Sequence, residues 1–394
     1  MKHWPTKPLG DFIAKRSGTV DPSRFPHEIF DLYSIPAFDS GEPEVRAGNE
    51  IGSAKQIVEP GDVLLSRIVP HIRRAWVVGV DRGRRLIGSG EWIVFRSPQF
   101  HPHFLRYFLV GDPFHGRFMQ TVSGVGGSLL RAKATEVAKI EVPMPPLAEQ
   151  ERIVKLLDEA DDLRKLRARA DRRTDALIPA IFHEMFGSSA QPWDSVPLGD
   201  LVQEFRYGTS NKSTAEGKPT LRIPNVVGQA LNLDDLKFVP VSGSEFDRLR
   251  LQDGDLLFVR TNGNADFIGR SAVFDARAIE AAGFEASEFI YASYLIRARL
   301  QADRAQPIFV QHFLRSPVGV RALRARSKTS AGQFNINTEG LGTIPVPVPP
   351  LALQKEFAQR VTEIRPMEAT QTAGRQGLET LFQSMLYRAF AGEM

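Results

Sequence analysis

The sequence predicts a mixed α/β protein with two tandem domains, each followed by a long α-helix, and with the two helices pairing as an antiparallel coiled coil. Three observations lead to this prediction. A six-residue segment at 145–150 (PPLAEQ) returns at 349–354 (PPLALQ). Each copy follows a short strand-like run and opens a long segment with apolar residues at helical spacing. Other landmarks recur in the same order, which indicates an internal duplication.

The duplicated landmarks extend along the chain. Residues 61–67 (GDVLLSR) return at 254–260 (GDLLFVR), and residues 8–11 (PLGD) return at 197–200. The spacings between landmarks differ, as expected when loops gain and lose residues. We therefore predict four segments: a first domain over 1–146, a first helix over 147–187, a second domain with a short linker over 188–348, and a second helix over 349–394.

Composition places the chain among globular proteins. Its 394 residues are 42% apolar and 24% charged, which is ordinary for a soluble chain of two or three domains. The absence of cysteine excludes disulfides and thiolate zinc sites, and it fits a cytoplasmic protein. No apolar run is long enough to span a membrane, and residues 1–10 lack the apolar core of a signal peptide.

Basic residues are concentrated once in each repeat, although the net charge is only +4. Residues 62–106 hold eight arginines against three acidic residues, and residues 297–328 hold seven arginines and one lysine against one acidic residue. Such clusters are the electrostatic footprint expected for a phosphate backbone. The alternative is a solvated surface, but two blocks in two repeats favour DNA or RNA. The candidates in the first block are Arg67, His71, Arg73 and Arg74.

The first domain is predicted to mix strands at 62–68, 77–80 and 92–95 with helices at 102–110 and 113–121. A glycine-rich loop follows at 123–128, where regular structure is costly. This loop is either a plain connector or a segment whose backbone closely approaches a phosphate or a base. Basic residues just beyond it favour the second interpretation, so the candidates here are Ser128, Arg131 and Lys133.

The second domain carries a polar loop at 207–212 and the segment RTNGN at 260–264. Asn-Gly is a strong hairpin-turn signal, but arginine, threonine and asparagine also read base edges, and both interpretations stay open. Residues 333–337 alternate polar and apolar side chains, as a half-exposed strand does. The DNA-binding candidates of this domain are Tyr207, Thr209, Lys212, Arg260, Thr261, Asn262, Asn264, Arg270, Gln333, Asn335 and Asn337.

The two helical segments each carry one apolar stripe, and the natural partner of one stripe is the other. A helix over 147–186 would be about 60 Å long at a rise of 1.5 Å per residue, so its stripe needs a partner. Pro179 should kink or divide it, while Pro366, Gly374 and Gly377 weaken the second helix and suggest two segments. The residues expected at the coiled-coil or partner interface are Leu147, Gln150, Ile153, Leu157, Leu163, Leu351, Gln354, Phe357, Val361 and Leu381.

Sequence motifs of catalysis are missing. The chain has no Asn/Asp-Pro-Pro-aromatic methyltransferase motif, no phosphate-binding loop, no His-Glu-x-x-His metal helix and no Gly-x-Ser-x-Gly elbow. The eight histidines show no metal-ligand spacing. These absences favour a binding protein over an enzyme.

The layout of two domains that alternate with two PPLA-x-Q helices resembles the DNA-specificity subunit of type I restriction-modification systems. The resemblance covers essentially the whole chain. The segments 256–274, which begins within GDLLF and contains IGR, and 333–351 also resemble its target-recognition domains. Two departures are Leu353, where the family usually has glutamate, and Pro366 within the second helix.

This resemblance implies a non-catalytic subunit with two target-recognition domains, each reading one half of a split double-stranded DNA site. The helices would set the gap between the halves and dock two methyltransferase (modification) subunits. Those partners would use S-adenosylmethionine to methylate adenine after flipping the base out of the duplex. Restriction subunits with translocase and nuclease activity, which need ATP and Mg, would be further partners, and this chain itself would bind no cofactor and no metal.

Two other classes of function stay open at this point. One is a self-contained DNA-acting enzyme whose site carries no recognised motif. The other is a duplicated module that binds a protein or a glycan.

Overall fold

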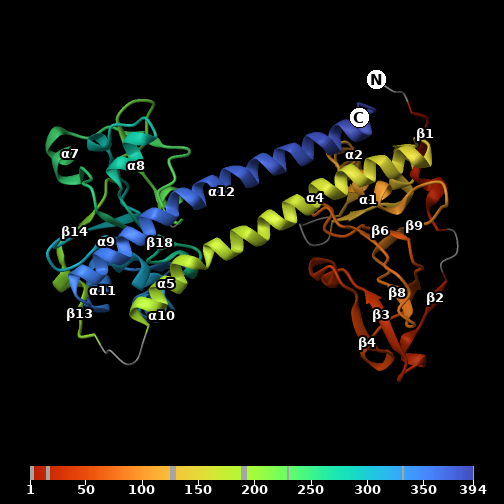
Figure 1. The fold of residues 1–394 in the computed structure, drawn as a ribbon, viewed down its shortest axis with the longest axis horizontal. Coiled ribbons are helices and arrows are strands. Elements are labelled where there is room, and N and C mark those ends of the chain that lie inside the picture. The colour runs from red at the N-terminus through yellow and green to blue at the C-terminus, as the bar shows by residue number, and fades with distance from the viewer. Residues whose placement is uncertain are drawn as a thin grey trace. The chain divides into compact units, whose positions relative to one another are not determined.

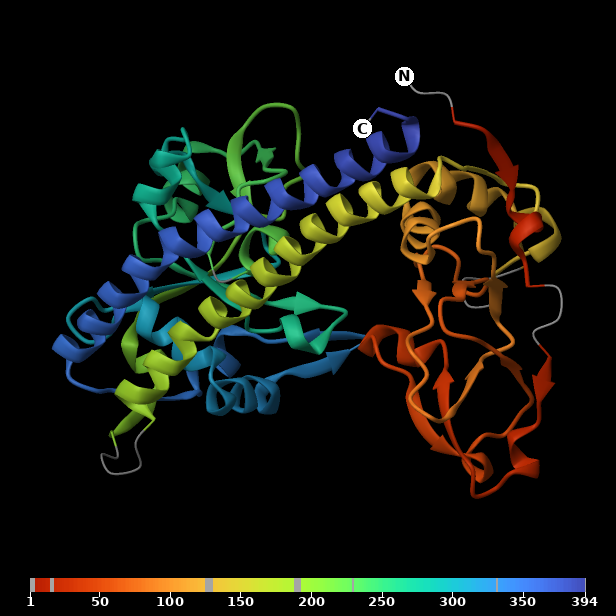
Figure 2. The same ribbon diagram turned by 45° about the vertical axis from the view of Figure 1, so that its right-hand side comes forward.

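The computed structural model describes residues 4–14, 18–124, 130–187, 193–228, 230–330 and 332–393. The chain forms two compact units (Figure 1 and Figure 2). The first unit comprises Met1–Arg169 and Ala373–Met394, and the second unit comprises Ala170–Thr372. Each unit therefore contains one α/β domain together with parts of the long helices.

The first unit holds its strands in small, mainly antiparallel sheets. Strand β1 (Thr6–Pro8) pairs with β12 (Glu141–Pro143), which closes the domain beside the start of the first long helix. The central sheet has the order β7-β6-β9, with β7 at Ala75–Val77, β6 at Val63–Ser66 and β9 at Trp92–Phe95. The outer sheet has the order β2-β5-β8-β3-β4, with its members at Thr19–Val20, Lys55–Ile57, Arg85–Gly88, Ile29–Tyr33 and Glu44–Ala47. Only its β3–β8 pair is parallel.

The second unit repeats this plan with different additions. Strand β13 (Ser195–Pro197) pairs with β24 (Pro345–Pro347), as β1 does with β12. The central sheet has the order β14-β21-β17-β19, at Val202–Tyr207, Leu295–Leu300, Leu256–Val259 and Ser271–Val273. The outer sheet has only three strands, in the order β16-β15-β20, at Lys237–Val239, Lys218–Leu221 and Ile290–Tyr291. Its β15–β20 pair is parallel, like β3–β8.

The repeated Gly-Asp turn has the same geometry in both units. Gly61 and Gly254 have φ values of 86° and 85°, a region that favours glycine. The next residue is a buried aspartate in each case. Asp62 accepts a hydrogen bond from Arg96 Nε at 2.6 Å, and Asp255 accepts one from Arg299 Nε at 2.8 Å. This agreement between matched side chains supports the duplication predicted from the sequence.

The helices of each domain cover its central sheet. A pair of helices with proline in the first turn follows that sheet in each unit: α1 (Pro102–Val110) and α2 (Asp112–Gln120), then α9 (Pro307–Arg315) and α10 (Pro317–Arg326). Their apolar faces contribute to the cores of the two domains. The shorter helices are α3 (Ala134–Val137), α6 (Ile223–Val226), α7 (Gly243–Leu249), α8 (Ala276–Ala281) and α11 (Thr338–Gly342).

The long helices are α4 (Leu147–Asp175), α5 (Leu177–Phe186) and α12 (Leu351–Ala391). The first predicted helix is divided, as expected, and Pro179 lies in the first turn of α5, where its missing N–H costs least. The second helix is continuous through Pro366, so the suggested division into two segments is wrong. Within the described part of the chain, no helix is both long and apolar enough to cross a membrane.

The long helices pair in antiparallel order inside each unit. In the first unit, Arg164 of α4 forms an ion pair with Glu379 of α12 at 2.6 Å, and its guanidinium lies over the Phe382 ring at 4.2 Å. In the second unit, Phe182 and Phe186 of α5 contact Phe357 of α12, with ring centroids 5.3 and 5.6 Å apart. Phe382 and Phe357 are both buried at these contacts between helices that run in opposite directions.

Candidate nucleic-acid interface

The central strand of the first unit, β6, leads directly to a pair of arginines. Arg67 follows this strand and donates to Glu91 at 2.9 Å through Nε. Arg131 donates to the other oxygen of the same carboxylate at 2.9 Å. One acid therefore holds two guanidinium groups at an exposed edge, and the cluster keeps a net positive charge. The Arg131 side chain is 60% exposed.

The matching residue of the second unit, Arg260, follows β17. Its guanidinium lies over the ring of Tyr207, 4.7 Å from the centroid, and donates to the Ser293 carbonyl at 3.4 Å. Among the residues that the structure describes, no carboxylate forms an ion pair with Arg260. An arginine in this environment keeps its full charge for a phosphate group, and the aromatic face holds its orientation.

A β-hairpin lies beside each of these arginines. In the first unit, β10 (Val122–Ser123) pairs with β11 (Arg131–Ala132), and Arg131 forms a bridge to Ile68. In the second unit, β22 (Lys328–Ser330) pairs with β23 (Gln333–Asn335), which also pairs with β18 (Thr261–Asn262). A two-stranded ribbon of this kind fits the major groove of DNA.

Two other candidates lie near the first hairpin. Lys133 is exposed at the start of α3, where it forms no ion pair with the described residues. Ser128 lies outside the described residues. The glycine-rich loop is therefore represented in the structure only by its two flanks.

On the second hairpin, Gln333 and Asn335 lie in β23, whereas Asn337, which was predicted to share their face, lies beyond the strand. Gln333 is exposed and Asn335 is half-buried, whereas Ile336 is buried. Thr261 Oγ1 donates to Gln333 Oε1 at 3.2 Å, which links β18 to the hairpin. Asn337 is exposed but has a structural role, since its Oδ1 accepts from Gly340 N at 2.8 Å and caps α11.

The Asn262-Gly263 pair is not a two-residue hairpin turn, because β18 pairs with β23 and not with the strand that follows it. Asn262 Oδ1 accepts from Asn264 N at 2.9 Å, and Asn264 Oδ1 accepts from Asp266 N at 2.9 Å. The side-chain oxygens therefore stabilise two successive turns. The two amide NH₂ groups form no hydrogen bond with described residues, so they are free donors for a base or a phosphate.

A polar cavity of about 470 Å³ lies in the second unit beside the 207–212 loop. Its lining includes Thr209, Asn211, Lys212, Arg222, Lys237 and Tyr294. Lys212 is exposed and has no ion-pair partner among the described residues. Arg222 and Lys237 share one carboxylate, that of Asp235, at 3.0 and 2.6 Å. Three cations around one acid make this cavity attractive to an anion.

Sequence reasoning missed Arg222 and Lys237. They lie beside Lys212 because β15 pairs with β16 and brings residues 218–220 against 237–239. No local pattern marks them, since Lys237 begins a short strand and Arg222 follows one. Only the strand pairing shows that they belong to one site.

Several predicted DNA contacts instead have partners within their own domain. Arg73 pairs with Asp112 at 2.6 Å, and Arg270 donates to the Asp266 carbonyl at 2.8 Å. The Arg74 side chain is only 12% exposed and lies 3.7 Å from Asp39. His71 is exposed, and Thr209 is buried. Other arginines of the basic blocks also form ion pairs: Arg82, Arg84, Arg85, Arg96, Arg297, Arg299 and Arg324.

The two glutamines of the repeated hexapeptide are buried, and they connect each long helix to its domain. Gln150 accepts from His101 N at 2.8 Å and donates to the Pro145 carbonyl at 2.9 Å. Gln354 accepts from Gln306 N at 2.9 Å and donates to the Pro349 carbonyl at 2.8 Å. Each glutamine thus supplies an acceptor for the backbone N–H at the N-terminus of α1 or α9, and it holds the start of α4 or α12 against that helix.

The other helix candidates divide into two groups. The buried group packs inside the chain: Ile153, Leu157, Phe357 and Val361. The second group is exposed, with Leu147 at 47%, Leu163 at 54% and Leu381 at 52%, whereas Leu351 is half-buried.

No protein-family model matches the chain. It is similar to the specificity subunit of the type I restriction enzyme EcoKI from Escherichia coli (strain K12), with 28% identity over 80% of this chain and 68% of that protein. It is also similar to the specificity subunit of the StySPI enzyme from Salmonella potsdam, with 24% identity over 76% of this chain and 66% of that protein. These matches span about two thirds of the length of either relative.

Solved structures share the fold of the chain. A chain from a structure described as the basis of assembly and conformational transition of the type I R-M system gives a TM-score of 0.59 at 20% identity, covering 99% of this chain and 98% of that one. The type I S subunit from M. genitalium gives a TM-score of 0.57 at 13% identity, covering 98% and 96%. The chain is thus similar in sequence to two type I restriction enzyme specificity subunits, and it shares its fold with chains from solved type I restriction-modification structures.

Proposed function

We propose that this chain recognises a split double-stranded DNA site, with one half of the site read by each unit. The observation that carries the proposal is the repeated pairing of a polar hairpin with an arginine at the end of the central strand. The relatives support this function and neither of the two alternatives, a self-contained enzyme or a protein- or glycan-binding module. Residues 1–146 and 188–348 are the proposed target-recognition domains, and residues 147–187 and 349–394 are the helical spacers.

The proposed contacts follow from chemistry and exposure. Gln333, Asn335 and the free amides of Asn262 and Asn264 supply paired donors and acceptors, which suits base edges in the major groove. Arg67, Arg131, Arg260 and Lys212 supply charge, which suits phosphates and determines affinity more than sequence choice.

The proposed partners are two methyltransferase subunits, which bring S-adenosylmethionine, and restriction subunits, which bring ATP and Mg. Leu163 and Leu381 are exposed on α4 and α12 in the first unit, and a partner that covers them would bury apolar surface and so stabilise the complex. This chain contributes sequence recognition and docking, and its own residues hold no cofactor.

Methylation mapping tests the proposal. The chain is expressed with the methyltransferase subunits of its own system, and the methylated adenines of the host DNA are located by sequencing. A two-part motif with a fixed gap is expected, and it should disappear when this chain is omitted. A continuous motif, or methylation that is unchanged without the chain, would contradict the proposal.

A further inference from the structure

The second unit contains a buried arginine where the first unit has an aliphatic residue. Arg297 lies on β21 and is only 1% exposed. In the matching strands, Leu64 pairs with Val94, and Leu257 pairs with Arg297. Val94 is a buried core residue. The same backbone position therefore accepts a small apolar side chain, so the shared fold does not itself require an arginine here.

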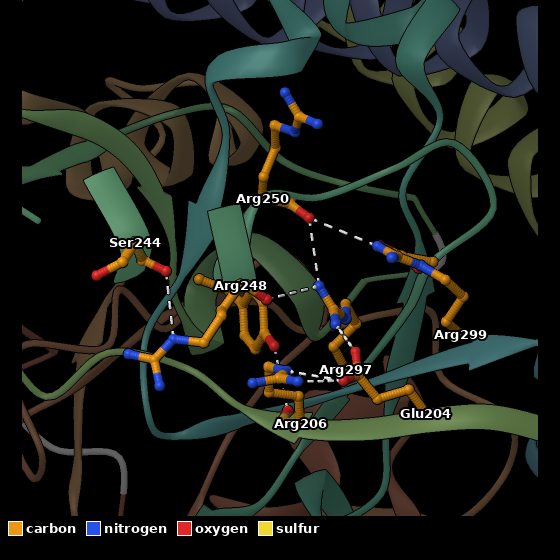
Figure 3. Close-up of polar contacts among 9 residues, drawn as sticks. Glu204, Arg206, Ser244, Arg248, Arg250, Arg297 and Arg299 are labelled. Atoms are coloured by element: carbon orange, nitrogen blue, oxygen red, sulfur yellow. Dashed lines mark hydrogen bonds and ion pairs between the residues drawn. The ribbon is translucent and has the colours of Figure 1, made fainter. Parts of the chain in front are cut away.

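Arg297 reaches the C-terminal end of helix α7 (Figure 3). Its Nη1 donates to the carbonyl oxygens of Arg248 and Arg250, at 3.3 and 3.2 Å. The last carbonyls of a helix lack partners within the helix, and they attract a cation. Arg297 supplies both the missing donors and the positive charge. The Arg297 guanidinium thus binds the C-terminal end of α7.

The buried charge of Arg297 is balanced by Glu204 of β14. Arg297 and Arg206 both form ion pairs with this carboxylate. The hydrogen bond from Arg206, followed by the charge of Arg297, lowers the pKa of Glu204. Because Arg206 remains when Arg297 is replaced, Glu204 keeps a charged partner. Removing Arg297 therefore takes away the donor to the Arg248 carbonyl and leaves the Arg250 carbonyl with the longer contact to Arg299 Nη2, at 3.5 Å.

Helix α7 in turn holds the loop that lines the polar cavity. Glu245 of α7 accepts from Thr209 Oγ1 at 2.9 Å and from Asn211 Nδ2 at 3.3 Å. Asn211 also donates to the Pro240 carbonyl at 3.0 Å. The adjacent residue, Lys212, projects a cation without an ion-pair partner among the described residues. The contacts thus run from Arg297 through α7 and Glu245 to this loop.

We infer that Arg297 is a positioning residue for DNA recognition by the second unit. It fixes α7, and α7 fixes the 209–212 loop so that Lys212, with Arg222 and Lys237, meets a phosphodiester of the DNA in the polar cavity. The inference rests on the proposed function, and it assigns this cavity an anionic ligand. Arg297 touches no DNA itself, so its effect on recognition passes entirely through Glu245 and the loop.

The test replaces Arg297 by valine, the residue at the matching position of the first unit (Val94), in the variant Arg297→Val. A second variant, Glu245→Ala, removes the contacts between α7 and the 209–212 loop. The exposed Arg277→Ala is the matched control, because it also removes one charge from the second unit. Each variant is assembled with its methyltransferase subunits. Competition binding then uses duplexes altered in one half-site or the other, and the melting temperature is measured alongside.

Both variants should lose about tenfold in discrimination at the same half-site and keep it at the other half-site. The phosphate contact carries no sequence information itself, but it fixes the register in which the second unit meets its bases. The double variant should lose little more than either single variant, because the two residues act through one connection. Arg297→Lys retains a cation that can reach the carbonyls, so it should recover part of the discrimination. The control variant should match the wild type.

Unchanged discrimination in both single variants would overturn the inference, as would an equal loss at both half-sites. If Arg297→Val fails to fold, the pair Glu204→Gln with Arg297→Met removes both partners of the buried ion pair and repeats the test. A wild-type complex that discriminates at neither half-site would instead contradict the proposed function.

Discussion

The two units share a scaffold but differ in the parts that surround it. Each scaffold contains a buried aspartate with its arginine and a buried glutamine at the start of a long helix. The outer sheet, by contrast, has five strands in the first unit and three in the second. The second unit also has α7 and the polar cavity beside it. The comparison indicates that the buried duplicated residues support the fold, and we propose that the choice of DNA sequence depends on the parts that differ.

Single side chains show the same division. The residue five positions after the first proline of α1 is Tyr107, and in α9 it is His312. Tyr107 donates to Asp158 at 2.6 Å, and burial raises its pKa. The His312 ring packs edge-on against Phe357, with 5.4 Å between centroids. Matched positions in the two units therefore make different contacts, a hydrogen bond to a carboxylate in one unit and an aromatic packing contact in the other.

The largest expected effect comes from removing a buried aspartate of the scaffold. Asp255→Ala leaves Arg299 and the amide of Gln252 without their acceptor, which should cost about 3–5 kcal/mol of unfolding free energy. Asp62→Ala should act in the same direction on the first unit, through Arg96 and the amide of Glu59, but less strongly because Arg96 keeps its ion pair with Glu59. Hydrogen exchange, measured at increasing denaturant concentration, gives the loss of protection in each unit separately. Equal loss of protection in both units from one substitution would contradict the idea of two independent scaffolds.

The second unit should also be destabilised by acid through His312. Burial lowers the pKa of His312 from 6.5 to about 3, so the folded unit holds this imidazole neutral. The unfolded chain binds the proton first as pH falls below 6.5. The contribution of His312 to the unfolding free energy of the second unit is therefore fully present above pH 6.5. As the pH falls from 6.5 toward 3, this free energy decreases by up to about 1.4 kcal/mol per pH unit.

Hydrogen exchange in the second unit between pH 7 and pH 5 measures this dependence. His312→Phe removes the titrating group and should flatten the profile of that unit. His183→Phe, an exposed histidine of α5, is the matched control and should leave the slope in place. A slope that survives in His312→Phe would assign the pH dependence to another group.

A smaller effect is expected from the two glutamines of the repeated hexapeptide. Gln354→Ala leaves the amide of Gln306 without an acceptor and should lower the unfolding free energy of the second unit by about 1–3 kcal/mol. Gln150→Ala should have the same effect on the first unit through His101 N. The exposed Gln359→Ala is the control for chemical denaturation. A control that costs as much as Gln354→Ala would show that burial of the glutamine is irrelevant.

The smallest effects concern the arginines that follow the central strands. Arg67→Ala and Arg260→Ala should each weaken DNA binding for every sequence and reduce the slope of log affinity against log salt by about one. Arg74→Ala should leave that slope unchanged, since Arg74 is largely buried near Asp39. Binding titrations at several salt concentrations measure all three. An unchanged slope in both Arg67→Ala and Arg260→Ala would remove these residues from the proposed interface.

Much of the fold was predictable because its signals are local. The repeated hexapeptide, the proline at the start of a helix and the alternation at 333–337 each act within a few residues, so the sequence displays them directly. Pro366 was misjudged because α12 as a whole accommodates it, despite the local penalty. Local chemistry alone cannot weigh a proline against the packing of a whole helix.

The candidate site was less predictable because its geometry depends on distant pairings. Whether an arginine meets a phosphate or a carboxylate is decided by which acid the fold places beside it. Arg67 and Arg131 share Glu91, whereas Arg260 lies over Tyr207. Likewise, no sequence pattern around Arg297 predicts that its side chain is buried. Its contact with α7 depends on the fold, which brings together residues that are far apart in the sequence.

The central claim is that each unit reads its own half of a split DNA site. The direct measurement exchanges residues 193–346 for the matching region of a type I specificity subunit with a known motif. The chimera is expressed with its methyltransferase subunits, and the methylated motif is mapped by sequencing. One half of the motif should change to that of the donor, while the other half stays as in the parent. A folded, active chimera in which both halves change, or neither half changes, would contradict independent recognition by the two units.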